Sequence, residues 1–290
     1  MSWHKPPAIF PWALVLSAAV LALCARHAEA AGAPIPHGRL ELVAEKQWIA
    51  AGHPFNVALQ FELEKGWHVY WVNPGDSGEP PRVTWDLPAG ITAGAIEWPA
   101  PRRLGTASIV DYGYEDTVML IVPMNAEANL AAQGPAQIAA EVKVLVCREM
   151  CIPGKSQVSL TLPVKPQTSP VNTKSADLFV AARKALPRPA PVNWKFGLSE
   201  TNDSFVLTGN LGRRITDAIF FPLAESQVSN AGPQTLLPTA SGFNLTLRKS
   251  DQLLKPIALL KGVLVLSGER AYSIDVPVGE PVAASTKGAG

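Results

Sequence analysis

The chain has 290 residues, with 25 Lys and Arg residues against 24 Asp and Glu residues and a net charge of +1. This near balance gives no reason to expect nucleic acid or an anionic membrane surface as a partner. The 27 Pro and 22 Gly residues are spread along the chain, and stretches with helical periodicity are scarce. Such a composition is typical of many short strands joined by turns.

The first 30 residues have the parts of an export signal. A short charged start precedes an almost purely apolar run over residues 8–25, and Ala28-Glu29-Ala30 supplies a small-x-small cleavage pattern. These features predict a signal peptide over residues 1–30, with Ala31 as the mature start. The mature protein is expected to be soluble and exported to a compartment where disulfides persist.

Cys24 lies inside this predicted signal peptide and suggests lipoprotein processing. Leu23, directly before it, is too large for that processing, so we expect Cys24 to be removed with the signal. No later segment is long and apolar enough to cross a bilayer. Cys147 and Cys151 are then the two cysteines of the mature chain.

Residues 31–165, here called the first β block, have strand-like patterns separated by Gly and Pro. The expected strands cover residues 40–43, 55–63, 67–72, 82–85, 118–123, 138–147 and 157–162. Alternation of apolar and polar residues is clearest at residues 142–146 and 158–162. About seven short strands with this spacing predict an antiparallel, immunoglobulin-like β-sandwich.

Residues 166–191 are expected to be a linker with a short helix. Ser175 is the predicted N-cap of a helix that runs through Leu186, and three Pro residues after Leu186 end it. Its apolar positions fall at helical spacing: Leu178, Phe179, Ala182 and Leu186.

Residues 192–280, the second β block, are expected to form a second sandwich, and residues 281–290 a disordered tail. Its expected strands cover residues 194–199, 204–211, 218–221, 242–247, 257–266 and 271–276. The predicted fold class is therefore all-β, with two immunoglobulin-like antiparallel β-sandwich domains joined by a short helical, proline-rich linker.

The cysteine pair is better explained as a redox centre than as a structural crosslink. Closing so short a loop restricts the unfolded chain by only about 2 kcal/mol, and a domain of this size does not depend on that contribution. The pair is expected at the mouth of a strand–turn–strand hairpin, where a labile bridge can form. Arg148 favours a thiolate at Cys147 and Glu149 opposes it, so an inert structural bridge stays open as an alternative.

Two other patterns have simpler explanations. Gly75-Asp76-Ser77-Gly78 resembles the nucleophile segment of trypsin-like proteases, but no complete double barrel precedes the serine. We interpret it as a turn. Trp67, Val69 and Trp71 alternate as one core face of a strand rather than as a stacking site for a ligand. The histidines before Ser77 lack metal-ligand spacing.

Three separated motifs together resemble the N-terminal periplasmic region of DsbD-type thiol:disulfide interchange proteins, in particular the suppressor-of-copper-sensitivity branch of membrane reductases. They are residues 66–78 (GWHVYWVNPGDSG), residues 112–115 (YGYE) and residues 146–154 (VCREMCIPG). The resemblance covers residues 36–165, and the second β block is similar to the additional β domain of that branch. It implies an immunoglobulin-like domain that takes electrons from a membrane-embedded relay and passes them to exported thioredoxin-fold proteins.

The resemblance also implies roles for individual residues. Cys147 and Cys151 match the redox pair, and Cys151 matches the cysteine that forms the mixed disulfide. The segment Asp111-Tyr112-Gly113-Tyr114 falls where the family has a loop that caps the pair, although some members have an aromatic residue at the position of Asp111. The cysteines are closer in sequence than in the best-known members.

The functional prediction is a periplasmic thiol:disulfide interchange module that needs no organic cofactor. Whether it is an enzyme stays open; if active, it is a thiol:disulfide oxidoreductase. Full DsbD-type proteins continue into a membrane domain, whereas this chain ends at Gly290, so its membrane reductase is expected to be a separate polypeptide. Cys147, Met150 and Cys151 also offer three soft sulfur ligands suited to Cu(I), so a copper-binding or copper-tolerance module is an alternative.

Overall fold

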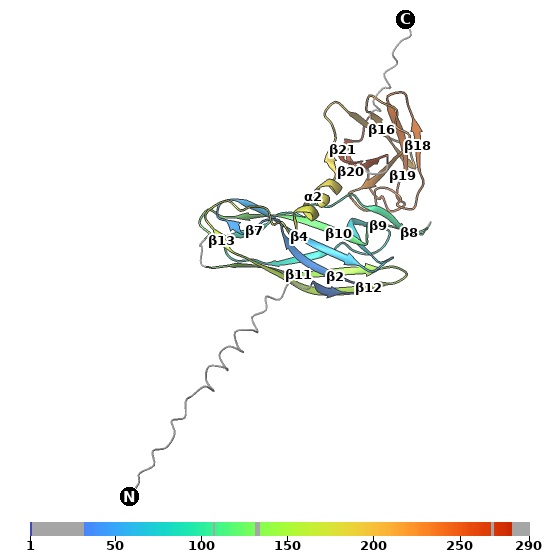
Figure 1. Cartoon of the computed structure of the whole chain (residues 1–290). Coiled ribbons are helices and arrows are strands. Elements are labelled where there is room, and N and C mark those ends of the chain that lie inside the picture. The colour runs from blue at the N-terminus through green and yellow to red at the C-terminus, as the bar shows by residue number, and fades with distance from the viewer. Residues whose placement is uncertain (2–31, 107, 131–133, 268–269, 280–290) are drawn as a thin grey trace. The chain divides into compact units, whose positions relative to one another are not determined.

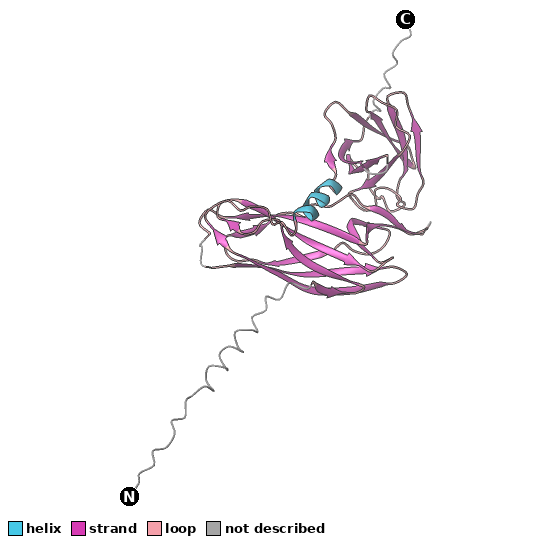
Figure 2. Cartoon of the chain, in the orientation of Figure 1, coloured by secondary structure: helices cyan, strands magenta, loops and turns pink. Residues whose placement is uncertain are grey.

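A computed structural model describes residue 1 and residues 32–106, 108–130, 134–267 and 270–279. The predicted signal peptide, apart from Met1, and the predicted tail at 281–290 lie outside these residues. Strands make up most of the described chain, with one α-helix (Figure 2). Within the described residues, no helix is long and apolar enough to cross a membrane.

Two sheets face each other in the first β block (Figure 1). The five-stranded sheet has the order β1 (Ala33–Ile35), β2 (Gly38–Ala44), β4 (Pro54–Leu63), β10 (Thr117–Ala126) and β7 (Ile91–Ala93). The second sheet has the order β12 (Cys151–Leu162), β11 (Ala136–Cys147), β5 (His68–Gly75), β9 (Val110–Glu115) and β8 (Arg102–Gly105), with β6 (Arg82–Asp86) paired to β11. Two short strands, β3 (Ile49–Ala50) and β13 (Val164–Lys165), pair in parallel.

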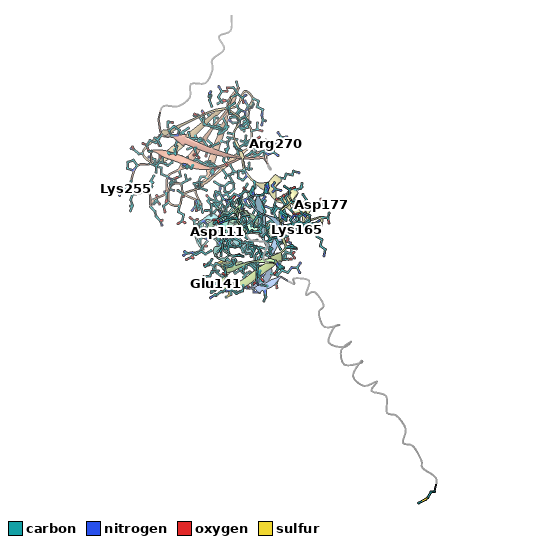
Figure 3. All side chains as sticks on the ribbon, turned by 90° about the vertical axis from the view of Figure 1, so that its left-hand side faces the viewer. Asp111, Glu141, Lys165, Asp177, Lys255 and Arg270 are labelled. Carbon is teal, nitrogen blue, oxygen red and sulfur yellow. A yellow bond between two sulfur atoms is a disulfide. The ribbon has the colours of Figure 1, made fainter. Side chains whose placement is uncertain are left out.

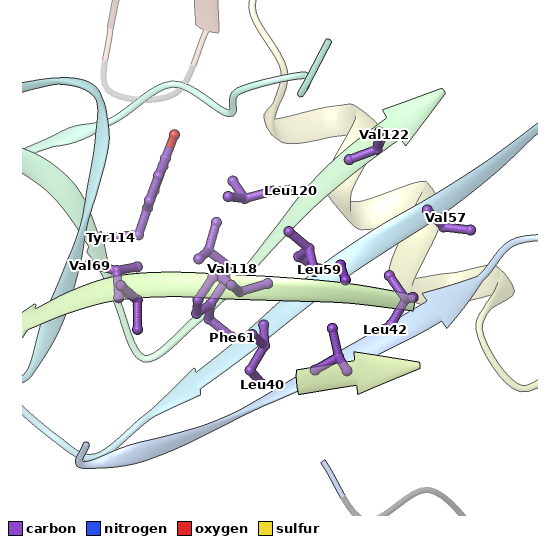
Figure 4. Close-up of a cluster of buried hydrophobic side chains, with 14 of the residues drawn as sticks. Leu40, Leu42, Val57, Leu59, Phe61, Val69, Tyr114, Val118, Leu120 and Val122 are labelled. Atoms are coloured by element: carbon purple, nitrogen blue, oxygen red, sulfur yellow. The ribbon is translucent and has the colours of Figure 1, made fainter. Parts of the chain in front are cut away.

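Apolar side chains from both sheets fill the space between them. On β2 and β4, alternate residues such as Leu40, Leu59 and Phe61 are fully buried, and Val69 and Leu120 join the same cluster (Figure 4). The period of two in these strands places one face of each sheet in the core. The predicted immunoglobulin-like sandwich is thereby confirmed.

Two four-stranded sheets form the second β block, and one of them includes residues 188–189 from the segment expected as the linker. One has the order β14 (Arg188–Pro189), β21 (Arg270–Pro277), β20 (Leu259–Leu266) and β17 (Ala218–Pro222); the other has the order β15 (Lys195–Glu200), β16 (Ser204–Asn210), β19 (Gly242–Arg248) and β18 (Gln234–Pro238). Strand β18 was not predicted, because none of its residues is fully buried and it therefore lacks a clear apolar face. Contacts unite residues Gly32–Gly290 in one compact unit, so the domain boundaries expected from the sequence stay predictions.

The helix α2 (Ala176–Ala185) differs in detail from the expected one. Ser175 stands at its N-cap, but its side chain makes no capping bond and instead donates to the Ala44 carbonyl at 2.6 Å. Phe179 and Ala182 pack into a small buried cluster with residues of β4 and β10, whereas Leu178 is 38% exposed. The helix thus contacts the sandwich through a narrower apolar face than its sequence predicts.

Candidate functional site

The cysteine pair closes the end of a long β-hairpin. Strands β11 and β12 pair in continuous antiparallel register from Ala136 opposite Leu162 to Cys147 opposite Cys151. The two cysteines form a disulfide, with their Cα atoms 4.1 Å apart. Cys147 is 2% exposed, whereas Cys151 is an exposed residue. A thiolate on another protein can therefore approach Cys151 far more readily than Cys147.

Strand β5 runs along the other side of Cys147 and places His68 directly opposite it. Opposed residues in an antiparallel pair project to the same face of the sheet, and Tyr70 follows His68 on that face two residues later. The His68 and Tyr70 rings meet edge to face at 5.1 Å. The other face of the strand carries Val69 and Trp71, both buried, which confirms the core face predicted from the alternation.

Tyr70 contacts the disulfide itself. Its hydroxyl lies 3.4 Å from the Sγ of Cys151. A disulfide sulfur carries no hydrogen, so the tyrosine hydroxyl is the donor. Tyr70 is fully buried, and this burial raises its pKa. The buried phenol is therefore a neutral hydrogen-bond donor beneath an exposed sulfur.

A buried carboxyl group lies behind this tyrosine. The Ser77 hydroxyl lies 3.0 Å from both carboxylate oxygens of Asp111, and the Ser77 backbone N–H donates to Oδ1, also at 3.0 Å. Burial raises the pKa of Asp111, and the hydrogen bonds with Ser77 counter part of this effect. Asp111 is 6% exposed and lies among the side chains of the first β block (Figure 3).

His68 faces the same carboxyl group without a hydrogen bond. Its Nε2 lies 3.9 Å from Oδ2 of Asp111 and has no hydrogen-bond partner. Burial lowers the pKa of His68, and the nearby carboxylates of Asp111 and Glu115 oppose this shift. The neutral imidazole favoured by burial means that this contact is not a charged ion pair near neutral pH.

The turn after β5 explains why glycine flanks Ser77. Gly75 and Gly78 both have positive φ angles, 95° and 79°, which glycine adopts without strain. A Cβ atom at Gly78 would overlap the ring of Tyr70. The protease-like sequence is therefore a turn, as predicted, and it holds the Ser77 hydroxyl and backbone N–H against Asp111.

Trp67 anchors the base of the hairpin turn. His37 stacks on this indole at 3.6 Å, and the Arg148 guanidinium lies 5.0 Å from the ring centroid. A cation over an indole face is attracted by the ring quadrupole. Arg148 is thereby directed toward Trp67 next to Cys147. The exposed Met150 follows in the same turn, at 67% exposure.

The segment expected to cap the pair forms strand β9 rather than a loop. Tyr112 packs edge to face against Trp71 and Phe221, at 6.4 and 5.2 Å. The Tyr114 hydroxyl donates to the Pro99 carbonyl at 2.8 Å, and its ring lies among core side chains (Figure 4). Gly113 pairs with Tyr70 across the sheet. A capping role for these residues stays a prediction.

Sequence reasoning missed the roles of three residues: His68 lies opposite Cys147, Tyr70 contacts Cys151, and Ser77 bonds to Asp111. His68 and Tyr70 alternate with the apolar residues of β5. Side chains with polar groups on the second face of an antiparallel strand are usually exposed to solvent. Here β11 and β9 flank β5 and both side chains are buried. The available signal was the motif itself, which holds His68, Tyr70 and Ser77 within ten residues.

Comparison with known proteins agrees with this geometry. Residues 39–163 match the family model of the N-terminal region of thiol:disulfide interchange protein DsbD. No curated protein sequence matches the chain. The crystal structure of the N-terminal periplasmic domain of ScsB from Proteus mirabilis aligns with a TM-score of 0.63 at 17% identity, covering 84% of this chain and 94% of that one.

The ScsB likeness is one of fold, and its coverage means that it extends beyond residues 39–163. The periplasmic chaperone SfaE aligns at 10% identity over 82% of this chain and 98% of that one, but its TM-score of 0.24 supports no argument. The resemblance predicted from the sequence is confirmed. The first β block, with its cysteine hairpin at residues 147–151, is similar to the DsbD N-terminal domains over residues 39–163.

Proposed function

We propose that this chain is a periplasmic module that relays electrons from a membrane reductase to exported thioredoxin-fold proteins through Cys147 and Cys151. The observation that carries the proposal is the asymmetry of the pair: Cys151 is exposed and Cys147 is buried. In this scheme residues 1–30 direct export, residues 31–165 carry the redox pair, and residues 192–280 form a second domain after the linker at 166–191.

The exchange proceeds through Cys151. A partner thiolate attacks the Sγ of Cys151, the disulfide breaks, and Cys147 leaves as a thiolate. A second partner thiolate then attacks the partner sulfur of the mixed disulfide and releases Cys151. The partner loses two electrons and two protons, and the chain gains them as two thiols. The reduced pair repeats these steps in reverse on an oxidised protein.

A trapping experiment tests this order of attack. The partner is a thioredoxin-fold protein whose single remaining active-site cysteine carries a thionitrobenzoate group, so that attack releases coloured thionitrobenzoate. Cys147→Ser should form the covalent complex, because Cys151 remains exposed and no second thiol resolves it. Cys151→Ser should form little. Equal trapping by both variants would remove the basis for assigning different roles to the two cysteines.

The copper alternative rests on Met150, whose exposed thioether follows Cys147 by three residues in the same turn. Thiolates and a thioether suit Cu(I). Titration of the reduced chain with Cu(I), compared with Met150→Leu, separates the two functions. A copper module predicts stoichiometric binding that Met150→Leu weakens. An exchange module predicts that Met150→Leu leaves the trapping rate unchanged.

A further inference from the structure

We infer that the second β block is a docked support for the redox site, in which Phe221 and Asn73 are positioning residues that fix the irregular part of β5 next to Tyr70. The inference rests on the proposed function and gives a role in it to the second β block, which lies outside the family match at residues 39–163.

Strand β5 is irregular directly after Tyr70. Tyr70 pairs with Gly113 of β9, but the next paired residue of β5 is Gly75, which lies opposite Asp111. Residues 71–74 of β5 therefore oppose Tyr112 alone. Extra residues at such an irregularity have no partner in the hydrogen-bonded ladder, so this segment needs other contacts to keep its shape.

Strand β17 of the second β block packs on this segment. Phe221 of β17 is 3% exposed, and its side chain belongs to the hydrophobic cluster of the first β block. Its ring meets Trp71 edge to face at 6.4 Å and Tyr112 at 5.2 Å. Val263 and Ala271, on the neighbouring strands β20 and β21, join the same cluster. The second block therefore contributes part of the core beneath the irregular segment.

Asn73 connects the same segment to the end of β17. Its Nδ2 donates to the Pro222 carbonyl at 2.8 Å, and its Oδ1 accepts from the Gly75 backbone N–H at 3.1 Å. Asn73 is 1% exposed, and burial of an amide costs free energy unless the amide is hydrogen-bonded. Movement of β17 away from β5 would leave the Asn73 amide and the Pro222 carbonyl without these partners, so the docked arrangement is favoured.

A second connection holds the turn that follows β5. The Asn230 Nδ2 donates to Oδ1 of Asp76 at 2.9 Å, and the Asn230 carbonyl accepts from Arg103 of β8 at 2.6 Å. The other carboxylate oxygen of Asp76 accepts from the Val110 backbone N–H at 2.8 Å. The second β block thus contacts β5, the turn after it and β8.

These contacts bear on Tyr70 because it is the last regularly paired residue before the irregular segment. Its ring packs against Gly78 of the turn, and its hydroxyl lies 3.4 Å from the Sγ of Cys151. A hydrogen bond donated to a thiolate favours the charged form. A fixed Tyr70 should therefore lower the pKa of Cys151 in the reduced protein, and loss of the docked arrangement should raise it.

The test measures the pH dependence of Cys151 alkylation by iodoacetamide in the full chain carrying Cys147→Ser, with the tryptic peptide of residues 149–155 followed by mass spectrometry. The midpoint reports the pKa of Cys151 and does not depend on access. Phe221→Ala should raise the midpoint and slow alkylation near neutral pH by about three- to tenfold, the upper value corresponding to loss of a whole hydrogen bond to a charged group.

Phe243→Ala is the matched control. Phe243 is also a buried phenylalanine of the second β block, at 1% exposure, but it belongs to the separate core of that block. Both substitutions should destabilise the fold, whereas only Phe221→Ala should move the midpoint. In a Tyr70→Phe background, Phe221→Ala should have little further effect on the midpoint, because the hydroxyl through which it acts is absent.

A milder variant covers the case in which Phe221→Ala does not fold. Asn230→Ala removes the side-chain bond to Asp76 from a partly exposed residue, so the fold should persist. The midpoint should rise, by less than in Phe221→Ala, because the Asn230 carbonyl still accepts from Arg103.

Three results would overturn the inference. They are an unchanged midpoint in Phe221→Ala, or in Asn230→Ala where the first variant does not fold; equal shifts in Phe221→Ala and Phe243→Ala; and a full Phe221→Ala shift in the absence of the Tyr70 hydroxyl. Failure of the proposed function would look different, because alkylation needs no partner protein. The trapping experiment would then yield no complex, while the midpoints would still decide the inference.

Discussion

The two β blocks differ in what they bury. Among the described residues, the buried polar side chains of the first β block are Gln60, His68, Asn73, Asp111 and Ser156, whereas the second β block buries only Thr208. Thr208 donates to the Gly197 carbonyl. Burying polar groups costs stability unless they are hydrogen-bonded. In the first β block, one of these buried polar residues, His68, lies directly opposite Cys147 of the disulfide. The core of the second β block is almost entirely apolar.

Because of this difference, substitutions in the core of the second block and beside the disulfide of the first should affect different properties, the stability of the fold in one case and the reactivity of the cysteines in the other. The core of the second β block depends on residues such as Phe205, Phe243 and Leu245, all essentially inaccessible to solvent. In the first β block, Tyr70 is equally buried, yet its hydroxyl reaches an exposed sulfur. Changes to these core residues of the second block should therefore alter stability alone, and changes beside the disulfide should alter reactivity most.

The largest effect should come from the exposed cysteine. Cys151→Ser should abolish exchange with a labelled thioredoxin-fold protein, because the remaining Cys147 thiol is 2% exposed and cannot reach the partner's mixed disulfide to attack it. The release of thionitrobenzoate from a labelled partner measures the rate. Exchange that continues at the wild-type rate would contradict the asymmetry between the two cysteines.

A core substitution in the second β block tests whether that core contributes to stability alone. Phe243→Ala should lower the free energy of unfolding by about 3–5 kcal/mol, the usual cost of removing a buried aromatic side chain. The rate at which Cys151 releases thionitrobenzoate from the labelled partner, in the Cys147→Ser background, should not change. Urea unfolding measures the first quantity. A changed release rate would show that the core of the second block also controls the chemistry of the pair.

Removing the disulfide should have a smaller effect on stability. Replacing both cysteines by Ser should lower the free energy of unfolding by about 2 kcal/mol, since the closed loop is short. The comparison uses urea unfolding of the oxidised wild type and the double variant. A double variant that fails to fold would instead support a structural role for the bridge.

The smallest effect concerns an ion pair that joins α2 to the first β block. Arg183 donates to both carboxylate oxygens of Glu45, at 2.6 and 2.8 Å. These bonds hold the pKa of Glu45 below its usual range. Glu45→Gln should lower the free energy of unfolding near neutral pH by about 1 kcal/mol, because Arg183 remains partly exposed to solvent.

The pH dependence of this effect has a defined sign. A carboxylate with a lowered folded-state pKa stabilises the fold fully above its unfolded-state pKa of about 4.3, and the contribution is lost as pH falls through the folded-state pKa. The difference between Glu45→Gln and the wild type should therefore vanish in acid. Glu141→Gln, which removes a more exposed pair with Lys155 on the β11–β12 hairpin, is the control and should change stability less at every pH.

The sequence by itself determined the fold class and singled out the cysteine pair that forms the disulfide. Alternating apolar residues in β2, β4 and β11 reveal their core faces, because the period of a strand depends only on local geometry. Cys147 and Cys151 are recognisable because four residues of separation and a following Pro-Gly already suggest a hairpin. The family motifs at residues 66–78 and 146–154 carry the same information.

Only the tertiary structure decided which residues surround the sulfur. Tyr70 reaches the disulfide because β5 pairs with β11 at a single register, His68 opposite Cys147, and pairing between strands far apart in sequence has no local signal. The same holds for Asp111: its strand, β9, joins the opposite edge of β5 and brings the carboxyl group to Ser77. His68, Tyr70 and Asp111 are buried because β11 and β9 flank β5 on its two sides. These strands are too far from β5 in the sequence for a local pattern to reveal the pairing.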